Sequence, residues 1–257
     1  MQRVLATLEA YHDAIEDCGC DATTGVLTSA VRDAANGAEF VETVRTRFGL
    51  DVRTIDGDEE AQLTFLGATT GREEPRGGPL LVVDIGGGST EFVVGAGGAV
   101  SFHVSTQAGV VRQTERHIHS DPPAPDELQT LAEEVRGVIA DGVPAEVRAE
   151  VAAAVGVAGT ATSCAAIEQE LDPYDPNRVE GFVLELGDLE LLLARLAAMR
   201  LAERRRVVGL HPDRAPTIVA GVVILLEALR AFDLDRIEVS ERDILWGAAI
   251  ARARQRA

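Results

Sequence analysis

The sequence predicts an α/β protein. Segments with the β-branched, apolar composition of buried strands alternate with segments whose apolar residues recur at helical spacing. The chain has 257 residues, 46% of them hydrophobic and 26% charged, which is enough to bury a core in one large or two small domains. A charged stretch rich in glycine and proline, GREEPRGGP at 71–79, indicates a linker between two such domains.

The first 70 residues have a βαβα pattern behind an N-terminal helix. That helix carries an apolar stripe made of Val4, Leu5, Leu8, Tyr11 and Ile15. Ser29 is suited to cap a second helix, and Gly49 to end a third. The expected elements are a helix at 3–17, a strand at 25–28, a helix from 29, a helix at 40–48, a strand at 52–55 and a helix at 59–67.

The remainder of the chain opens on a predicted hairpin and then alternates again. A polar loop containing DPPAP at 121–125 follows the hairpin. The elements expected after it are a helix at 126–140, a strand at 149–158 that breaks at GTATS (159–163) into a helix, helices at 188–206 and 214–231, a strand at 237–240 and a last helix at 242–254.

Composition excludes several classes of partner. A net charge of −18 repels polyanions, so we expect neither nucleic acid nor an anionic membrane surface to bind. The longest apolar stretch, near 219–226, is broken by Glu227 well short of a membrane span. The N-terminus lacks the apolar core of a signal peptide, which favours a cytoplasmic protein. All 24 basic residues are arginines, whose forked guanidinium suits carboxylates and phosphates.

The most informative stretch is LLVVDIGGGSTEFVVG, at 80–95. Two runs built for a sheet are separated by three glycines, with Asp84 closing the first strand and Glu91 opening the second. A Walker P-loop would need a lysine and a following helix, and a dinucleotide fingerprint would need a third glycine that opens a helix. This stretch therefore fits neither motif. A plain hairpin needs only two special residues, and stays open as the structural alternative.

Anion binding is the interpretation that explains both the glycines and the acids. Successive glycines let backbone N–H groups point into one concavity that holds phosphate oxygens, and the hydroxyls of Ser89 and Thr90 add donors. A bare carboxylate would repel phosphate, so Asp84 predicts a bridging divalent cation, with Glu91 holding the same ion. Mg²⁺ is the expected cofactor and Mn²⁺ the alternative ion.

Several ordered motifs resemble the exopolyphosphatase/guanosine-pentaphosphate phosphatase (Ppx/GppA) family of the actin-like superfamily. They are TSAVRDA at 28–34, GDEEAQLTFLGA at 57–68, DIGGGSTEF at 84–92, VAGTATS at 157–163, TIVAGVVILLEAL at 217–229 and VSERDILWG at 239–247. The resemblance implies a two-domain actin-like (ribonuclease H-like, ASKHA) fold. Its first domain would comprise residues 1–76 with the C-terminal helix 243–257, and its second domain residues 77–242.

The resemblance also assigns roles to individual residues. Glu60 matches the general base that activates water, and Glu59 is its catalytic neighbour. Asp84 and Glu91 match the metal-binding acids. Arg32 matches an arginine that reaches substrate phosphate; alternatively it is an ordinary surface arginine. The phosphate-binding set implied in this way is completed by Gly86, Gly87, Gly88, Ser89 and Thr90 of the turn, and by Gly159 and Thr160 of a loop that in related kinases lies near the nucleotide.

One family feature has no match. Family members carry a second phosphate hairpin at the N-terminus, whereas Met1 here enters a helix at once, so the first domain is expected to be N-terminally truncated, with candidate strands only near Val26 and Val52. Either the start was assigned too far downstream, or the chain is a degenerate member that binds phosphate without efficient turnover.

The implied activity is that of a phosphoanhydride hydrolase. The leading hypothesis is an exopolyphosphatase that releases orthophosphate from polyphosphate; the alternatives are a guanosine pentaphosphate phosphatase and a catalytically weak phosphate or nucleotide sensor. An arginine-rich segment, with Arg200, Arg204, Arg205 and Arg206, is either a solvated basic face or a guide for a phosphate chain. Whether the chain forms a homodimer stays open.

Overall fold

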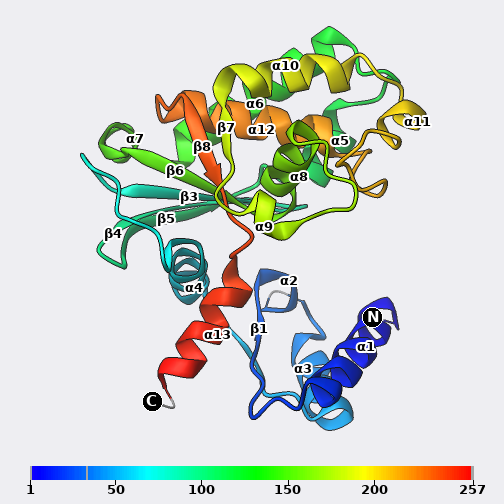
Figure 1. The fold of residues 1–257 in the computed structure, drawn as a ribbon, viewed down its shortest axis with the longest axis vertical. Helices are drawn as coiled ribbons and strands as arrows, with labels where there is room; N and C mark the ends of the chain where they lie inside the picture. Colours follow the sequence, from blue (N-terminus) through cyan, green and yellow to red (C-terminus); the bar gives the residue numbers. More distant parts are fainter. Residues whose placement is uncertain (1, 33, 256–257) are drawn as a thin grey trace. The chain divides into compact units, whose positions relative to one another are not determined.

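The computed structural model describes residues 2–32 and 34–255, which fall into two compact units (Figure 1). Unit 1 comprises Met1–Gly67 and Ile244–Ala257, and unit 2 comprises Ala68–Asp243. The division falls inside helix α4 (Gly57–Thr69). Residues 68–76, which the sequence analysis placed with the first domain, therefore belong to unit 2.

Unit 1 is built on a two-stranded parallel sheet. Strand β1 (Gly25–Leu27) pairs with β2 (Val52–Thr54), at the positions where the sequence predicted strands. Its other elements are α1 (Gln2–Cys18), α2 (Ser29–Arg32), α3 (Gly37–Phe48), the start of α4, and α13 (Ile244–Arg254). As predicted, Gly49 ends α3: its φ of 63° is left-handed and its N–H donates to the Arg45 carbonyl.

Unit 2 contains a six-stranded mixed sheet in the order β5-β4-β3-β6-β8-β7. The strands are β3 (Leu80–Ile85), β4 (Thr90–Ala96), β5 (Ala99–Thr106), β6 (Ala153–Val157), β7 (Val183–Glu185) and β8 (Arg236–Val239). Strands β3, β6 and β8 run parallel in the centre, and the hairpin partners β4 and β5 extend one edge. The buried, nearly continuous apolar runs of β3 and β6 are typical of central parallel strands.

The helices of unit 2 cover the sheet and form its main core. They are α5 (Val110–His117), α6 (Pro125–Gly142), α7 (Ala145–Glu150), α8 (Ala158–Glu168), α9 (Pro176–Val179), α10 (Leu186–Ala197), α11 (Leu201–Arg204) and α12 (Ile218–Ala231). Helix α12 contacts α5, α6, α8 and α10 and is buried along almost its whole length (Figure 1). A helix that is apolar on all sides is buried in this way.

The structure corrects the sequence analysis in several places. The segment expected to be a polar loop after the hairpin contains β5 and α5; Gly97 and Gly98, both with positive φ, form the tight turn between β4 and β5. The helix expected at 188–206 is two helices, α10 and α11. They separate at Arg200, whose backbone is extended and whose N–H donates to the Glu203 carboxylate as the start of a new helix.

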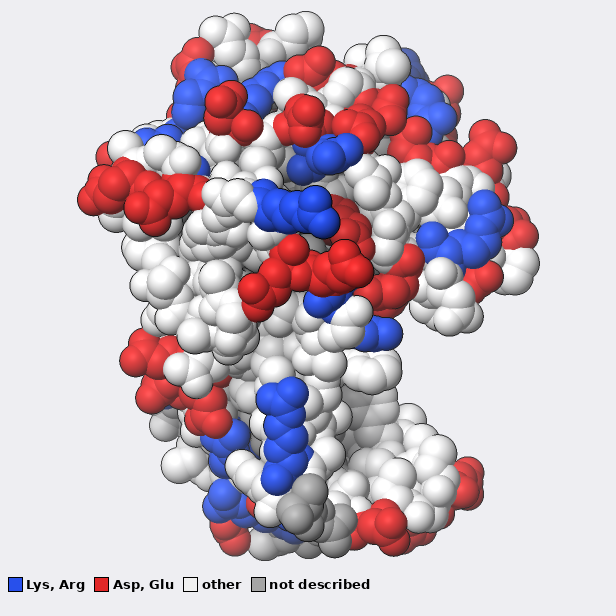
Figure 2. All heavy atoms as spheres, turned by 60° about the vertical axis from the view of Figure 1, so that its left-hand side comes forward, with Lys and Arg blue, Asp and Glu red and all other residues white. Residues whose placement is uncertain are grey.

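Charge is dispersed over the surface. On the face drawn in Figure 2, acidic side chains and arginines lie next to one another and do not form a patch of one sign. Among the described residues, no helix is both long and apolar enough to cross a membrane.

Candidate active site

The glycine turn of unit 2 rests on the N-terminal end of α5. Gly86 to Ser89 connect β3 to β4, and the Gly86 N–H closes the loop by donating to the Ser89 carbonyl at 3.0 Å. The three glycine carbonyls all accept hydrogen bonds from α5. The Gly86 carbonyl accepts from the Val110 N–H, the Gly87 carbonyl from the Val111 N–H and the Gly88 carbonyl from the Arg112 Nε, each at 2.9 Å.

These carbonyl contacts fix the direction of the amide hydrogens. In a planar trans peptide the N–H points opposite to the carbonyl of the preceding residue. Because the carbonyls of Gly86, Gly87 and Gly88 point toward α5, the N–H groups of Gly87, Gly88 and Ser89 point away from it. No backbone carbonyl in the described part of the chain accepts from these three. Successive N–H groups aimed to one side form a concavity that suits a phosphate oxygen.

Thr90 anchors the turn through hydrogen bonds made by its hydroxyl and its backbone carbonyl. Its side chain is fully buried, and its hydroxyl donates to the Ala108 carbonyl at 2.7 Å. The Thr90 carbonyl in turn accepts from the Thr106 hydroxyl at 2.9 Å. Thr90 was predicted to contact phosphate; in this structure the first residue of β4 points into the core, so its role is to anchor the turn.

Replacing Thr90 with valine tests this structural role. We expect the change to destabilise the protein by ~1–3 kcal/mol, because it leaves a buried carbonyl without its donor. Thermal unfolding followed by circular dichroism measures this loss. Serine at the same position keeps the hydroxyl and is the control. A valine variant as stable as the parent, but with weaker phosphate binding, would instead assign Thr90 to the ligand.

The two acids of the motif lie opposite each other across the hairpin. Asp84 and Glu91 are directly paired in the β3–β4 register, so their side chains are on the same face of the sheet. Glu91 accepts a hydrogen bond from the Ser105 hydroxyl at 2.7 Å. Among the described residues, no group of three or more His, Cys, Asp or Glu side chains is placed so that it could hold a metal ion. One or two carboxylates beside a phosphate loop match the ligands that Mg²⁺ prefers, because it keeps several waters.

In unit 1, Glu60 and Arg32 are brought together. Glu60 lies in the first turn of α4, and Arg32 is the last residue of α2. An Arg32 guanidinium nitrogen lies 3.8 Å from a Glu60 carboxylate oxygen and also donates to the Ile55 carbonyl at 2.8 Å. The Glu60 side chain is only 22% exposed. The structure therefore places a half-buried carboxylate beside a half-buried guanidinium.

Glu59, predicted as the catalytic neighbour of Glu60, has a different environment. Its carboxylate accepts two hydrogen bonds from Arg53, at 2.5 and 2.6 Å. Its N–H is capped by the Asp56 carboxylate at 2.8 Å. The bonds to Glu59 raise the pKa of the Arg53 guanidinium. The Glu59 carboxylate is therefore engaged in a bidentate, charge-assisted pair, which is a different environment from that of Glu60 beside Arg32.

Gly159 and Thr160 begin α8 at the same sheet edge as the glycine turn. Strands β3 and β6 are parallel with Asp84 opposite Val157, so the chain enters the turn and α8 side by side. A β-carbon at Gly159 would overlap the Arg214 guanidinium, the end of a long side chain that would have to move aside. Thr160 is buried, and its side chain fits against Gly221 of α12. Gly159 thus lies at the loop that was predicted to bind phosphate, whereas the Thr160 side chain packs in the core.

A cavity of about 980 Å³ opens beside Gly159 within unit 2. Its lining combines the guanidinium groups of Arg205, Arg206 and Arg214 with the carboxylates of Asp172, Glu241 and Asp243, and it also includes His211 and Tyr174. Burial, followed by the hydrogen bond to Glu241, raises the pKa of Tyr174, so the phenol stays protonated. The sequence analysis did not single out His211 or Arg214, although the proline-bounded stretch HPDRAP marks a loop that concentrates polar side chains.

The arginine-rich segment divides between core and cavity. Arg204 is 4% exposed, and its guanidinium donates to the carbonyls of Ala215, Leu196 and Met199. Desolvation on burial lowers the Arg204 pKa. Arg205 and Arg206 are exposed at the cavity. Neither a uniform solvated face nor a uniform phosphate guide describes the segment, because Arg204 serves the fold.

The comparison with known sequences identifies the family. Residues 1–246 match the Ppx/GppA phosphatase family. The chain belongs to the Ppx/GppA phosphatase family. It is 36% identical to exopolyphosphatase 2 of Mycobacterium tuberculosis over 240 residues, and this alignment covers 89% of this chain and 74% of that protein. It is 28% identical to exopolyphosphatase 1 of Mycobacterium bovis, over 92% of this chain and 69% of that protein.

Solved structures of this family have the same fold. The Ppx/GppA protein of Aquifex aeolicus superposes with a TM-score of 0.86 and 31% identity, covering 99% of this chain and 81% of that one. An exopolyphosphatase-like protein gives a TM-score of 0.88 and 31% identity over all of this chain and 85% of that one. The predicted α/β fold class is confirmed, and this Ppx/GppA chain is a phosphoanhydride hydrolase.

Proposed function

We propose that this chain is a metal-dependent exopolyphosphatase that hydrolyses the terminal phosphoanhydride of inorganic polyphosphate and releases orthophosphate. The observation that carries the proposal is the set of three successive N–H groups at Gly87, Gly88 and Ser89 that point away from α5, an arrangement suited to a phosphoryl group. Relatives named exopolyphosphatase support the choice of substrate.

The proposed reaction assigns one task to each group of residues. The N–H groups of the turn bind the terminal phosphoryl group and stabilise the charge that develops on it. Glu60 orients the attacking water and accepts its proton, and Arg32 contacts a phosphate oxygen. In-line attack breaks the bond between phosphorus and the bridging oxygen, and the shortened chain leaves with that oxygen.

The divalent ion enters the proposal through Asp84 and Glu91. These carboxylates would hold Mg²⁺, or Mn²⁺, and the bound ion would neutralise charge on the phosphate oxygens. The Ser105 hydroxyl, 2.7 Å from a Glu91 oxygen, orients that carboxylate. Hydrogen-bonded outer partners of this kind hold metal ligands in position.

The assay is orthophosphate release from long-chain polyphosphate, with and without chelation. We expect release in Mg²⁺, its loss after dialysis against a chelator, and its return when Mg²⁺ is restored. Unchanged turnover in the chelated protein would contradict the metal dependence. Tight polyphosphate binding by calorimetry with no release in any divalent metal would identify a phosphate sensor and overturn the proposal.

A guanosine pentaphosphate 5′-phosphatase is the second candidate. The cavity beside Gly159, with its arginines and Tyr174, has room for a group larger than a phosphate chain, and this observation favours a nucleotide. The ratio of kcat/KM for polyphosphate to that for guanosine pentaphosphate decides between the two. A ratio below one would transfer the assignment to the nucleotide.

A further inference from the structure

The Gly88 carbonyl differs from the other two glycine carbonyls of the turn in the kind of donor that holds it. The carbonyls of Gly86 and Gly87 accept from backbone N–H groups of α5, which a change of side chain does not remove. The Gly88 carbonyl accepts from the side chain of Arg112, whose Nε lies 2.9 Å away. The hydrogen bond that holds the Gly88–Ser89 peptide therefore comes from a side chain.

Packing does not hold this peptide in its observed direction. Gly87 and Gly88 are exposed, and a β-carbon built at Gly88 would meet no atom within 4 Å. Glycine also adopts backbone conformations that other residues avoid, so the backbone at Gly88 opposes a peptide flip only weakly. Because the C=O and the N–H of a trans peptide point in opposite directions, a flip would turn the Gly88 oxygen toward the phosphate concavity.

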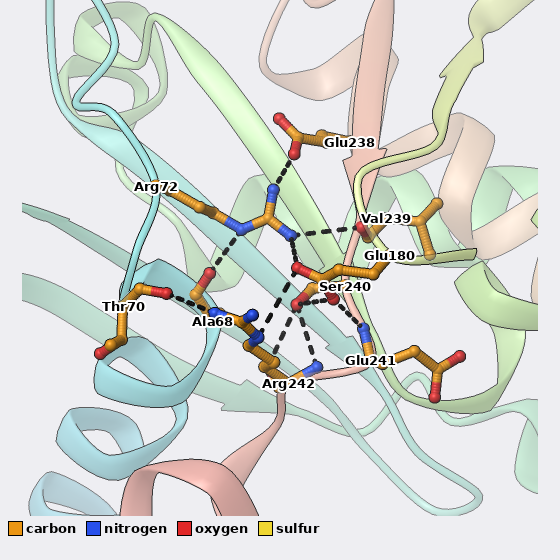
Figure 3. Close-up of polar contacts among 9 residues, drawn as sticks. All are labelled: Ala68, Thr70, Arg72, Glu180, Glu238, Val239, Ser240, Glu241 and Arg242. Atoms are coloured by element: carbon orange, nitrogen blue, oxygen red, sulfur yellow. Dashed lines mark hydrogen bonds and ion pairs between the residues drawn. The ribbon is translucent and has the colours of Figure 1, made fainter. Parts of the chain in front are cut away.

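The arginines of unit 2 differ in what balances their charge. The Arg72 guanidinium bonds the carboxylates of Glu180, at 2.6 Å, and Glu238, and its side chain is only 12% exposed (Figure 3). Arg112 is exposed, and no carboxylate of the described residues pairs with it. No acid of the described chain therefore competes with the Gly88 carbonyl for the Arg112 Nε.

We propose that Arg112 is a positioning residue that locks the Gly88–Ser89 peptide with its N–H aimed at the bound phosphoryl group. It acts through the turn and does not touch the reacting atoms. The consequence for binding and catalysis rests on the proposed function, whereas the lock itself does not. Without the lock, only the molecules with an unflipped peptide offer all three N–H groups, and the apparent affinity falls in proportion to that fraction.

Two substitutions separate the donor from the charge. Arg112→Met keeps a side chain of similar length but has a methyl group where the Nε stood. Arg112→Gln places an amide nitrogen at the same number of bonds from Cα as the Nε, so it keeps a donor and loses the charge. Arg116→Met is the control: Arg116 lies one turn further along α5, is 63% exposed and pairs with Glu134 at 2.8 Å. It removes the same charge without a hydrogen bond to the turn.

The lock is tested by an NMR measurement that needs no substrate. The nuclear Overhauser effects between the two Gly88 Hα protons and the Ser89 N–H depend on the direction of the peptide that joins these residues. We expect their relative intensities to change in Arg112→Met, to return toward the parent in Arg112→Gln and to stay as in the parent in Arg116→Met. Parent-like intensities in Arg112→Met overturn the inference.

Calorimetric binding of polyphosphate supplies the second readout. We expect Arg112→Met to weaken binding ~10-fold, the scale of one hydrogen bond from a charged group, with Arg112→Gln recovering most of the loss. Arg116→Met should bind within about twofold of the parent, because salt screens an exposed charge that does not contact the turn. If Arg112→Gln binds as weakly as Arg112→Met, the charge and not the directed donor is responsible, and the positioning role is refuted.

Failure of the proposed function is distinguishable from failure of this inference. Titration of the parent with inorganic phosphate should shift the amide signals of Gly87, Gly88 and Ser89, and in Arg112→Met the response of Ser89 should fall more than that of Gly87. A parent whose turn amides do not respond refutes phosphate binding at the turn, and the Overhauser intensities still decide the lock. A flipped peptide with parent-like phosphate binding refutes the positioning role.

Discussion

Replacing Glu60 with glutamine should lower kcat for orthophosphate release by at least ~10²-fold, the contribution of one positioned catalytic base. The amide is almost isosteric, but it cannot accept a proton from water. KM should change little, because the N–H groups of the glycine turn bind phosphate independently of Glu60. Single-turnover and steady-state phosphate release measure the effect, with thermal unfolding as the check on folding.

Glu59→Gln is the matched control on the same helix turn. Glu59 is held by Arg53 at 2.5 and 2.6 Å in an exposed pair, and such pairs contribute only about 0–1 kcal/mol to stability. We expect Glu59→Gln to keep kcat within about threefold of the parent, since its carboxylate is already occupied. If Glu59→Gln removed activity and Glu60→Gln did not, Glu59 and not Glu60 would be the catalytic base.

Replacing Gly109 with alanine should lower kcat/KM by about 10²-fold, the scale of losing a preorganised donor at the reacting phosphate. Gly109 precedes α5 and has an ordinary φ of −89°, so the backbone conformation tolerates a side chain. The space around Gly109 does not accommodate one, because a β-carbon would overlap backbone atoms of Gly87, Gly88 and Ser89. Backbone cannot yield like the end of a long side chain, so the turn must move.

Two measurements separate this effect from general destabilisation. Overpacking should lower the free energy of unfolding by ~1–3 kcal/mol, seen in denaturant titration. Calorimetric binding of polyphosphate should weaken in parallel with kcat/KM. Gly137→Ala, at a position on α6 with no atom within 4 Å of the new β-carbon, should instead stabilise by about 0.5–1 kcal/mol and leave the kinetics unchanged. Normal binding by Gly109→Ala would show that the turn does not hold the phosphate.

Local sequence patterns predicted much of the fold because they depend only on residues that are adjacent in the chain. The end of α3 at Gly49 follows from the left-handed conformation that glycine favours. The strand β5 was missed because its outward polar residues resembled a loop, although the Gly97-Gly98 turn marks a hairpin. The break between α10 and α11 depends on the Glu203 carboxylate capping the Arg200 N–H, which an apolar periodicity does not reveal.

The sequence by itself determined which chemistry is present: glycines flanked by acids in DIGGGSTE, and two adjacent glutamates that open a helix. Only the tertiary structure decided how these groups act. The N–H groups of the turn take their direction from α5, Thr90 is turned into the core, Arg214 covers Gly159, and Glu59 is occupied by Arg53. The physical reason is that residue type fixes what a group can bond, whereas its partner and direction depend on segments brought near by folding.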